Sequence, residues 1–326
     1  MARVTARDVA RAAGVSLSAV SRAFRPDRPL AEAKRARILA AARALGYDSP
    51  YAQAISTLAT GTIALVAGDF ENPFYPKAAH VLSQAIHRTG RRMILHVVPP
   101  DGDVDTVLEQ VLAYRADAAI VTSSLMSSRI ARECRDQNLP VILFNRVQPD
   151  AGMTAVTCDN YGGGRLVADR LIAQGRRRIA LIGGRSDTST HLERSRGFRD
   201  RLDEAGLAPV DIRAGDYAYD RAFAAARDLV GDVRPDAVFC LNDVMALAAI
   251  DAARRAGMAV PDDLAVIGFD DIPMADWPSY RLTTVRQPLN RMCADALDLI
   301  ETQRQDPGAA SAIRVAPVRL ILRDSG

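Results

Sequence analysis

Residues 5–24 read T-A-R-D-V-A-R-A-A-G-V-S-L-S-A-V-S-R-A-F. Apolar residues at helical spacing run up to Gly14, and glycine is a common residue at the end of a helix. Ser16 is a favoured N-cap residue and can begin a second short helix that extends to about Phe24. Two short helices joined by A-G-V-S predict a helix-turn-helix.

The second of these helices is expected to have two different faces, because successive residues are about 100° apart around a helix. Val20 and Ala23 share the side that can pack on the first helix. The residues on the opposite side lie mainly in the N-terminal half of the helix, and in this motif that half enters the major groove of DNA. There Arg22 can donate to guanine O6 and N7, and Leu17 can contact a thymine methyl. A solvated face of an ordinary amphipathic helix would show the same periodicity. The outward side carries Leu17, Ser18, Ser21 and Arg22.

The remainder of the first 60 residues supports a small basic domain. Residues 1–60 hold ten Arg or Lys and four Asp or Glu, a net charge of +6. The other residues hold 32 basic and 35 acidic side chains, a net charge of −3. Such a distribution favours attraction of the phosphate backbone by the N-terminal domain alone. A third helix is expected over 32–45, with one apolar side formed by Ile38, Leu39, Ala42 and Leu45.

The run 5–24, with A-A-A-R-A-L-G-Y ending at Tyr47, resembles the helix-turn-helix of the lactose-repressor/galactose-repressor (LacI/GalR) family. This motif is long and specific. The resemblance implies that bases are read by Leu17, Ser18 and Arg22. It also implies that phosphates are held mostly by Thr5, Ser16 and Ser21.

Two positions depart from the family pattern. Ala31 stands where relatives usually carry a serine cap before the third helix. In the linker, family members usually have P-N-x-x-A-R-x-L, a hinge helix that puts a leucine into the minor groove. Here Tyr51 and Ile55 replace the Asn and the Arg, and Leu58 is the candidate wedge.

From residue 62 onward, short apolar runs alternate with amphipathic helices. This alternation predicts parallel sheets with helices on both faces, and the number of runs suits two sheets better than one. Strands are expected over 62–66, 93–98, 118–122, 141–144, 156–158, 179–182, 237–240 and 264–268, with a last strand over 315–322. Helices are expected over 77–88, 106–114, 164–174, 196–205, 221–229 and 243–256.

This body resembles the same family over essentially its whole length and, through it, the periplasmic sugar-binding proteins. The resemblance implies an α/β protein with a three-helix helix-turn-helix head (1–49), a hinge segment (50–60) and a bilobed, periplasmic-binding-protein-like body (61–326) built on two parallel, doubly wound sheets. Lobe one is expected over about 61–157 and 288–318, and lobe two over about 158–287 and 319–326. The matching landmarks are N-P-F-Y (72–75), F-N-R (144–146), D-N (159–160), R-S-R-G-F (194–198), L-N-D-V-M-A (241–246), G-F-D-D (268–271) and L-T-T-V-R-Q-P (282–288).

Each landmark lies near the end of an expected strand or the start of the next helix, where ligands collect in open α/β sheets. Aromatic rings, amides, a guanidinium and a carboxylate suit a small effector that is polyhydroxylated or heterocyclic: a sugar, a sugar acid or a purine. Asn145 replaces the acid that usually precedes Arg146 in the family, so a sugar preference does not transfer directly. Matched to the family motifs, the effector-binding positions are Phe74, Tyr75, Asn145, Arg194, Tyr217, Asn242 and Asp270.

Several nearby residues have a structural reading as well. Asp159 and Asn160 either line the cleft or only cap a helix that starts near Tyr161. We expect Asp271 to have a structural role and Trp277 to pack or to lie at the rim. The run Gly162-Gly163-Gly164 lacks the rest of a phosphate-loop motif, so close helix packing is its expected role.

The remaining features favour a regulator over an enzyme. The four histidines are isolated, and no HExxH, nucleophile-elbow or Walker motif is present, so no catalytic activity, metal or cofactor is expected. The four cysteines are widely spaced and are expected to be buried free thiols. A free-standing sugar-binding protein would need a signal peptide and would leave residues 1–60 unexplained. No apolar run approaches the roughly 18 residues of a membrane span, so a cytoplasmic protein is expected.

A two-helix reader is small, so a homodimer on a palindromic operator is expected, with the body forming the dimer contacts. No heptad repeat follows the last expected strand, so we expect no tail-built tetramer. The sequence therefore predicts a sequence-specific, DNA-binding transcriptional regulator, and we expect it to be a repressor. Its affinity for double-stranded operator DNA is expected to be switched by a small molecule.

Overall fold

The computed structural model describes residues 4–24, 30–45, 47, 60–99, 102–122, 126–148 and 152–326. The chain forms two compact units, Met1–Thr60 and Gly61–Gly326. Within the described ranges, no helix combines the length and the apolar character needed to cross a membrane.

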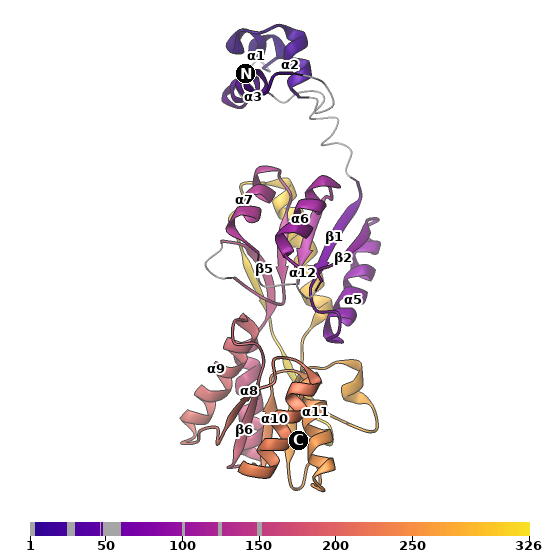
Figure 1. The fold of residues 1–326 in the computed structure, drawn as a ribbon, viewed down its shortest axis with the longest axis vertical. Helices are drawn as coiled ribbons and strands as arrows, with labels where there is room; N and C mark the ends of the chain where they lie inside the picture. Colours follow the sequence, from indigo (N-terminus) through magenta and orange to yellow (C-terminus); the bar gives the residue numbers. More distant parts are fainter. Residues whose placement is uncertain are drawn as a thin grey trace. The chain divides into compact units, whose positions relative to one another are not determined.

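The N-terminal unit, hereafter the head, is the predicted bundle of three helices: α1 (Ala6–Ala13), α2 (Leu17–Ala23) and α3 (Glu32–Leu45) (Figure 1). Gly14 ends α1 in the left-handed conformation (φ 62°, ψ 45°), which costs glycine no steric clash. The core of the head is small. One side chain from each helix is almost fully buried at its centre: Val9, Val20 and Ile38.

The last turn of α3 departs from the expected apolar side. Ala42 is buried, but Leu45 is 38% exposed, so its predicted place in the core is wrong. Tyr47, just beyond the helix, packs instead on Phe24 at the end of α2, with ring centroids 5.8 Å apart.

The second unit, hereafter the body, holds two six-stranded sheets. The first sheet has the strand order β11-β5-β4-β3-β1-β2, and every neighbouring pair in it is parallel. Its strands are β1 (Thr62–Ala67), β2 (Arg92–Val97), β3 (Ala118–Val121), β4 (Val141–Phe144), β5 (Thr154–Cys158) and β11 (Ile313–Ala316).

The second sheet has the order β12-β10-β9-β8-β6-β7 and is parallel except at one edge, where β12 runs antiparallel to β10. The expected all-parallel arrangement is therefore wrong at this edge. The reason is the chain path: β10 leads out of lobe two, whereas β12 enters lobe two directly from β11 of the other sheet. The strands are β6 (Ile179–Gly183), β7 (Ile212–Ala214), β8 (Ala237–Cys240), β9 (Ala265–Asp270), β10 (Thr283–Arg286) and β12 (Arg319–Ile321).

Helices cover both faces of each sheet. In β1, Ile63 and Leu65 are buried together with side chains of α5 and α12, whereas Ala64 and Val66 are buried with side chains of α6 and α7. Alternate residues of a strand point to opposite faces, so a continuous apolar run is what a strand covered on both faces requires. These helices are α5 (Phe74–Arg88), α6 (Val104–Ala113), α7 (Ser128–Asp136) and α12 (Leu289–Gln305).

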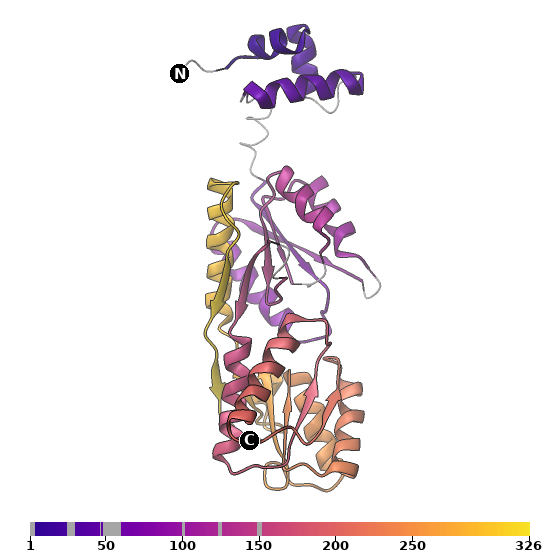
Figure 2. The ribbon, with the colours of Figure 1, turned by 90° about the vertical axis from the view of Figure 1, so that its left-hand side faces the viewer.

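In the second sheet, α8 packs with α9 and α10 packs with α11, and the two pairs lie on opposite sides of the strands (Figure 2). The helices are α8 (Asn160–Ala173), α9 (Ser189–Glu204), α10 (Tyr219–Asp228), followed by the π-turn η2 (Leu229–Val233), and α11 (Asp243–Arg255), with a short 3₁₀ turn η3 (Pro273–Asp276). The helices α7 and α12 and the strands β7 and β10 have no counterpart among the expected elements, and the single expected strand over 315–322 is divided into β11 and β12.

The glycines of α8 have the packing role that was expected of them. A Cβ on Gly164 would lie 2.2 Å from the backbone oxygen of Arg194 in α9, and a Cβ on Gly197 would lie 2.0 Å from the backbone oxygen of Tyr161 in α8. The two helices therefore approach so closely that each needs a glycine facing the other. This approach places the middle of α9 beside the start of α8.

The chain passes between the two sheets three times: from β5 to α8, from β10 to α12 and from β11 to β12. Each sheet with its helices forms one lobe, and lobe one contains α12 because that helix packs on α5, β4 and β5. Since β5, β10 and β11 all end at the crossings, their carboxyl ends meet where the lobes meet. Ligands bind at this edge in open α/β sheets.

Candidate functional site

Helix α2 presents the outward face that the sequence predicted. Ser16 caps the helix, because its Oγ accepts a hydrogen bond from the backbone N–H of Ala19 at 3.3 Å. Ala19, Val20 and Ala23 are at most 3% exposed. The division of the helix into two faces is thus confirmed, whereas the contacts with DNA stay a prediction. The exposed residues are Ser16, Leu17, Ser18, Ser21 and Arg22.

Two arginines shape the end of this helix. Arg22 donates from Nε to the backbone oxygen of Ser18 at 3.2 Å, which leads its side chain along the exposed face. Arg35 of α3 donates to the backbone oxygens of Arg22 and Ala23 at 3.2 and 2.7 Å. A cation at the C-terminus of a helix satisfies its last carbonyls and complements its dipole. Arg35 thereby ties α2 to α3 and holds the orientation of the outward face.

The other two predicted DNA contacts differ in what the structure says of them. Thr5 donates to the carboxylate of Asp8 from both its backbone N–H (3.0 Å) and its hydroxyl (2.7 Å), so its side chain is held at the start of α1. The hydrogen bonds hold the pKa of Asp8 below its usual value. Leu58 lies outside the described residues, as does most of the expected hinge segment.

In the body, a cavity of about 240 Å³ lies between the lobes. Six of the seven predicted effector positions line it, together with three residues that the prediction missed. Asn72 and Arg146 belong to the quoted motifs N-P-F-Y and F-N-R. Thr190 lies one helical turn before Arg194 on α9, a spacing that places both on the same face of the helix. The lining residues are Asn72, Phe74, Tyr75, Asn145, Arg146, Thr190, Arg194, Tyr217 and Asp270.

Asn242 and Trp277 do not line this cavity. Asn242 begins α11, where its Oδ1 accepts a hydrogen bond from the N–H of Met245 at 2.9 Å. Trp277 is 53% exposed. The structural reading of Asp159 also holds, because its carboxylate accepts from the N–H of Gly162 at 2.8 Å and caps α8. For Asn160, in contrast, the structure shows a further role.

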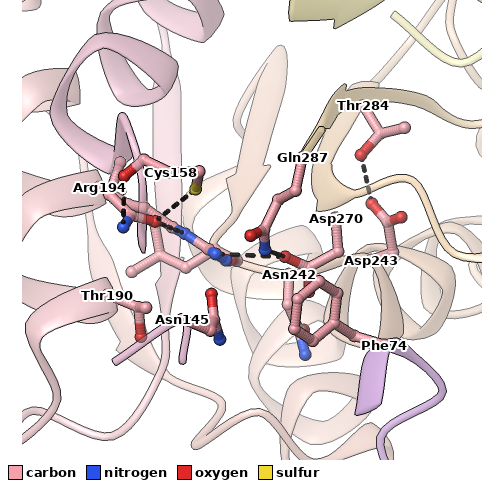
Figure 3. A network of polar contacts seen from close by, with 12 residues as sticks. Phe74, Asn145, Cys158, Thr190, Arg194, Asn242, Asp243, Asp270, Thr284 and Gln287 are labelled. Atoms are coloured by element: carbon pink, nitrogen blue, oxygen red, sulfur yellow. Dashed lines mark hydrogen bonds and ion pairs between the residues drawn. The ribbon is translucent and has the colours of Figure 1, made fainter. Parts of the chain in front are cut away.

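Arg194 is the centre of a buried polar network (Figure 3). Its Nε donates to Asn160 Oδ1 at 2.8 Å, its Nη1 donates to the backbone oxygen of Leu241 at 2.6 Å, and its Nη2 lies 3.2 Å from Asp270 Oδ1. The guanidinium also lies 3.6 Å from the ring centroid of Phe269. All three nitrogens of Arg194 are therefore engaged within the protein. Its main effect is to fix the shape and charge of the cleft wall.

Asp270 faces the cavity at the end of β9. Its Oδ1 also accepts from Gln287 Nε2 at 2.7 Å. Burial raises the pKa of Asp270 above its usual value, although Arg194 and Gln287 oppose the shift. The neighbouring Asp271 behaves differently: burial acts to raise its pKa, but hydrogen bonds from Arg323 and Arg286 hold the pKa below its usual value. Asp271 thus has the structural role expected of it.

The backbone is strained at three of the lining residues. Asn145 (φ 74°), Tyr217 (φ 64°) and Asp270 (φ 115°) all lie in the region of positive φ that favours glycine. Such conformations persist only where the surrounding structure enforces them, and they concentrate at functional sites. Tyr217 also needs Gly184 beneath its ring, because a Cβ there would lie 2.0 Å from the ring carbon Cζ.

Several polar atoms around the cleft are buried without a hydrogen-bond partner in the described part of the chain. Buried polar atoms are nearly always paired, so a cluster of unpaired ones calls for a partner from outside the chain. Two of these atoms are acceptors and two are donors, and the two that belong to lining residues of the cavity, Asn145 Oδ1 and Arg146 Nε, can be satisfied by a hydroxylated ligand. The acceptors are Asn145 Oδ1 and Gln287 Oε1, and the donors are Arg146 Nε and Asn242 Nδ2.

The chemistry around the cleft is that of binding. Burial raises the pKa of the Cys158 thiol to about 12, so the thiol stays protonated and donates to Asn160 Oδ1 at 3.4 Å. All four cysteines are buried, as the sequence predicted. In the residues that the structure describes, no group of three or more His, Cys, Asp or Glu side chains could hold a metal ion.

Two hydrogen bonds join the lobes beside the cavity. Lys77 of α5 donates to the backbone oxygen of Asp271 at 2.5 Å. The N–H of Val147, after β4, donates to Ser189 Oγ at the start of α9 at 3.0 Å. The cavity is therefore enclosed by contacts from lobe one to lobe two, and a change in how the lobes meet would change both its shape and these contacts.

Comparison with known proteins identifies both units. Residues 5–49 match the family described as bacterial regulatory proteins, lacI family. Residues 168–326 match the periplasmic binding protein-like domain.

Individual relatives match along almost the whole chain. The chain is 31% identical to the HTH-type transcriptional regulator DegA of Bacillus subtilis (strain 168), over 99% of this chain and 98% of that protein. It is 32% identical to the ribose operon repressor of Escherichia coli (strain K12), over 91% of this chain and 92% of that protein. Among solved structures, the transcriptional regulator CelR–cellobiose complex matches with a TM-score of 0.74 at 30% identity, over 99% of this chain and 100% of that chain.

Proposed function

The chain belongs to the LacI family of bacterial regulatory proteins, and from this premise we propose that it represses transcription from a palindromic operator, which it binds as a homodimer until a small effector in the interlobe cleft changes its affinity. The observation that carries this proposal is the division of labour within one chain. The head exposes a polar face of α2, whereas the body buries unpaired polar atoms between two lobes. A ligand-controlled DNA-binding regulator needs both features, whereas an enzyme has no need of the exposed helix face.

For the head, the proposal assigns base contacts to Leu17, Ser18 and Arg22. These side chains project from a capped helix whose other face is buried, which suits insertion into a major groove. Phosphate contacts are assigned to Thr5, Ser16 and Ser21, and insertion into the minor groove to Leu58. Since the operator that it binds is part of the bacterial genome, the proposal places the protein in the cytoplasm.

For the homodimer, the exposed edge of the first sheet is the proposed contact surface. Strand β2 lies at this edge, and its side chains Ile94, Leu95 and Val97 are 41–50% exposed. An edge strand with neighbouring apolar side chains is unfavourable in water unless another surface covers it. A second copy of the chain is the occupant that a two-fold symmetric operator requires.

For the effector, we propose a sugar or a sugar derivative. Aromatic side chains, amides and unpaired donors and acceptors line the cleft, which suits a hydroxylated ring. The solved CelR complex contains cellobiose, and another relative is named as the repressor of a ribose operon, which supports a carbohydrate for this chain.

The proposed switch works through the two lobes. A ligand that contacts Asn145 of lobe one and Asp270 of lobe two favours the lobe arrangement in which it makes both contacts. Three segments connect the lobes, so ligand binding can change the position of lobe one relative to lobe two. The head is joined to lobe one through the chain, so this change can reach the head. The coupling equals the difference in the ligand's affinity for the two arrangements, typically about 1–3 kcal/mol.

The test uses the full chain in three steps. Operator duplexes are selected from a randomised library, a thermal-shift screen of sugars, sugar acids and purines finds stabilising ligands, and operator affinity is then measured with and without each of them. A ligand at 100 times its Kd stabilises by about 2.7 kcal/mol, which such a screen detects. Selection without any sequence preference would refute the DNA-binding half, and a stabilising ligand that leaves operator affinity unchanged would refute the coupling. A deletion of residues 1–60 should abolish operator binding and keep the thermal shift.

A further inference from the structure

Arg146 is a buried cation without a counterion. It directly follows Asn145 at the end of β4, lines the cavity and is only 8% exposed. Its Nε is buried without a hydrogen-bond partner. Within the described residues, no carboxylate oxygen lies within 4.0 Å of its guanidinium nitrogens. Its recorded aromatic contact is the ring of Tyr75, whose centroid lies 6.0 Å away.

The carboxylates around Arg146 have other partners. Asp270 is ion-paired with Arg194, and Asp187 is ion-paired with Arg185 at 2.8 Å. Asp69, in the loop after β1, accepts a hydrogen bond from the backbone N–H of Asn72 at 3.2 Å. None of them forms an ion pair with Arg146.

The lining of the cavity therefore carries an excess of positive charge. Its ionisable side chains are the cations Arg146 and Arg194, the anion Asp270, and the two tyrosines. Burial raises the pKa of Tyr75, which keeps its phenol neutral. Beside the cavity, Lys77 adds another cation, which donates to a backbone oxygen rather than to a carboxylate.

A charged group with a buried, unpaired nitrogen, as at Arg146 Nε, is costly, because that nitrogen has lost its water and gained no anion in exchange. The hydrogen bonds that a guanidinium makes to a carboxylate or a phosphate are among the strongest in proteins, since they are charge-assisted and often bidentate. In the same cleft, each side-chain nitrogen of Arg194 has a hydrogen-bond or ion-pair partner within the protein (Figure 3). Arg146 lacks such partners, and a ligand can supply them.

The identity of residue 145 removes the most immediate protein partner. Asn145 is 4% exposed, and its Nδ2 donates to the hydroxyl of Tyr75 at 3.5 Å, while its Oδ1 is unpaired. A carboxylate at this position would bring a negative charge to the residue next to Arg146. An amide brings none, so the positive charge of Arg146 remains available to a ligand.

We propose that the effector carries an anionic group, a carboxylate or a phosphate, which binds to Arg146, on a hydroxylated frame. This inference rests on the function proposed above. Next to Arg146, the unpaired acceptor Asn145 Oδ1 lines the same cavity and requires a hydroxyl donor. A sugar acid and a sugar phosphate both meet these requirements.

Calorimetric titration of the full chain tests the proposal with matched probes. The carboxylate probes are D-gluconate and D-glucuronate, the phosphate probes are D-glucose 6-phosphate and D-ribose 5-phosphate, and the neutral references are D-glucose and D-ribose. At least one anionic probe is expected to bind about ten- to a hundredfold more tightly than its neutral reference, the range that a hydrogen bond to a charged group supplies. Which pair of probes shows the preference separates a carboxylate from a phosphate.

Substitutions assign the preference to Arg146. Arg146→Gln is expected to remove the difference between the anionic probe and its neutral reference, and Arg146→Lys to retain part of it. Asn145→Asp should weaken binding of the anionic probe and strengthen binding of the neutral sugar. Arg227→Gln is the matched control, because that cation is 68% exposed and paired with Asp228 away from the cavity lining, and its binding profile should equal that of the wild type.

Neutral references that bind as tightly as the anionic probes would overturn the proposal, and so would the absence of any anionic probe whose binding depends on Arg146. Operator binding by each variant, measured in parallel, shows that the variant is folded. If operator binding responds to neutral sugars, this inference fails while the proposed function stands. If the wild-type chain selects no operator, the proposed function fails as well.

Discussion

Arg194 and Asp270 form a buried ion pair in the wall of the interlobe cleft, with 3.2 Å between Nη2 and Oδ1. Their side chains are 3% and 5% exposed. The two residues come from α9 and from the end of β9, 76 positions apart in the chain. The pair therefore links α9 to β9 within lobe two, and it contributes one positive and one negative charge to the cleft wall.

Arg194→Ala should leave the Asp270 carboxylate buried without its cation. We expect the free energy of unfolding of the body to fall by about 3–5 kcal/mol, the usual effect of removing one partner of a buried pair. Operator binding should survive at temperatures where the variant stays folded, and the response to effector should be lost. Urea unfolding and fluorescence anisotropy with labelled operator measure the two effects. Arg196→Ala, on the exposed side of the same helix, is the control; an unaltered effector response in Arg194→Ala would remove that residue from the site.

Arg22→Ala should weaken binding to the selected operator by about 1–3 kcal/mol and relax the preference at one base pair, as expected when a bidentate contact to guanine is lost. The measurement is a competition between the operator and variants of it changed at single positions. Arg11→Ala, an exposed arginine of α1, should weaken binding without changing the preference. Equal weakening on all sequences by Arg22→Ala would mean that Arg22 contacts only phosphate.

Asp243→Asn should change how stability depends on pH. Burial, reinforced by repulsion from Asp270, raises the pKa of Asp243 well above 3.8. The native state therefore keeps a proton that the unfolded chain releases, so ionisation of Asp243 costs the wild type stability as the pH rises above about 4. Urea unfolding between pH 4.5 and 8 should show that the free energy of unfolding of the variant increases relative to that of the wild type as the pH rises. Parallel profiles for the two proteins would contradict the assignment.

Gly164→Ala tests the close approach of α8 and α9. Its new methyl group would lie 2.2 Å from the backbone oxygen of Arg194, so we expect a loss of about 1–3 kcal/mol from overpacking. Gly231→Ala is the matched control, since nothing lies within 4 Å of a Cβ there. Thermal unfolding compares the two variants, and a Gly164→Ala protein as stable as the control would show that the helices can separate without cost.

Leu95→Arg tests the proposed dimer surface. A charge on the exposed edge strand β2 should oppose apolar contact with a second copy, so the variant should sediment as a monomer at concentrations where the wild type is a dimer. Leu192→Arg, which alters a 54% exposed leucine of lobe two, should remain dimeric. Dimeric Leu95→Arg would place the interface elsewhere on the body.

Much of the local structure could be predicted because its causes are local. Gly14 and Ser16 act within one turn of the chain, and the faces of α2 follow from its own periodicity. The long apolar strands were found for the same reason. The strands β7 (Ile-Arg-Ala) and β10 (Thr-Thr-Val-Arg) were missed because they are short and contain polar residues, whereas the equally short β3, β4 and β8 are continuous apolar runs. The direction of β12 was wrong because it follows from the path between the lobes.

By itself, the sequence determined the helix-turn-helix, its outward face and the alternation of strands and helices that brings landmark motifs to strand ends. Only the tertiary structure decided which polar groups in the cleft have partners. Arg194 is fully engaged by Asn160, Leu241 and Asp270, whereas Arg146 faces the cavity without a carboxylate. The physical reason is range: capping and periodicity act over a few residues, but the satisfaction of a buried charge depends on groups that the two sheets bring together from distant parts of the chain.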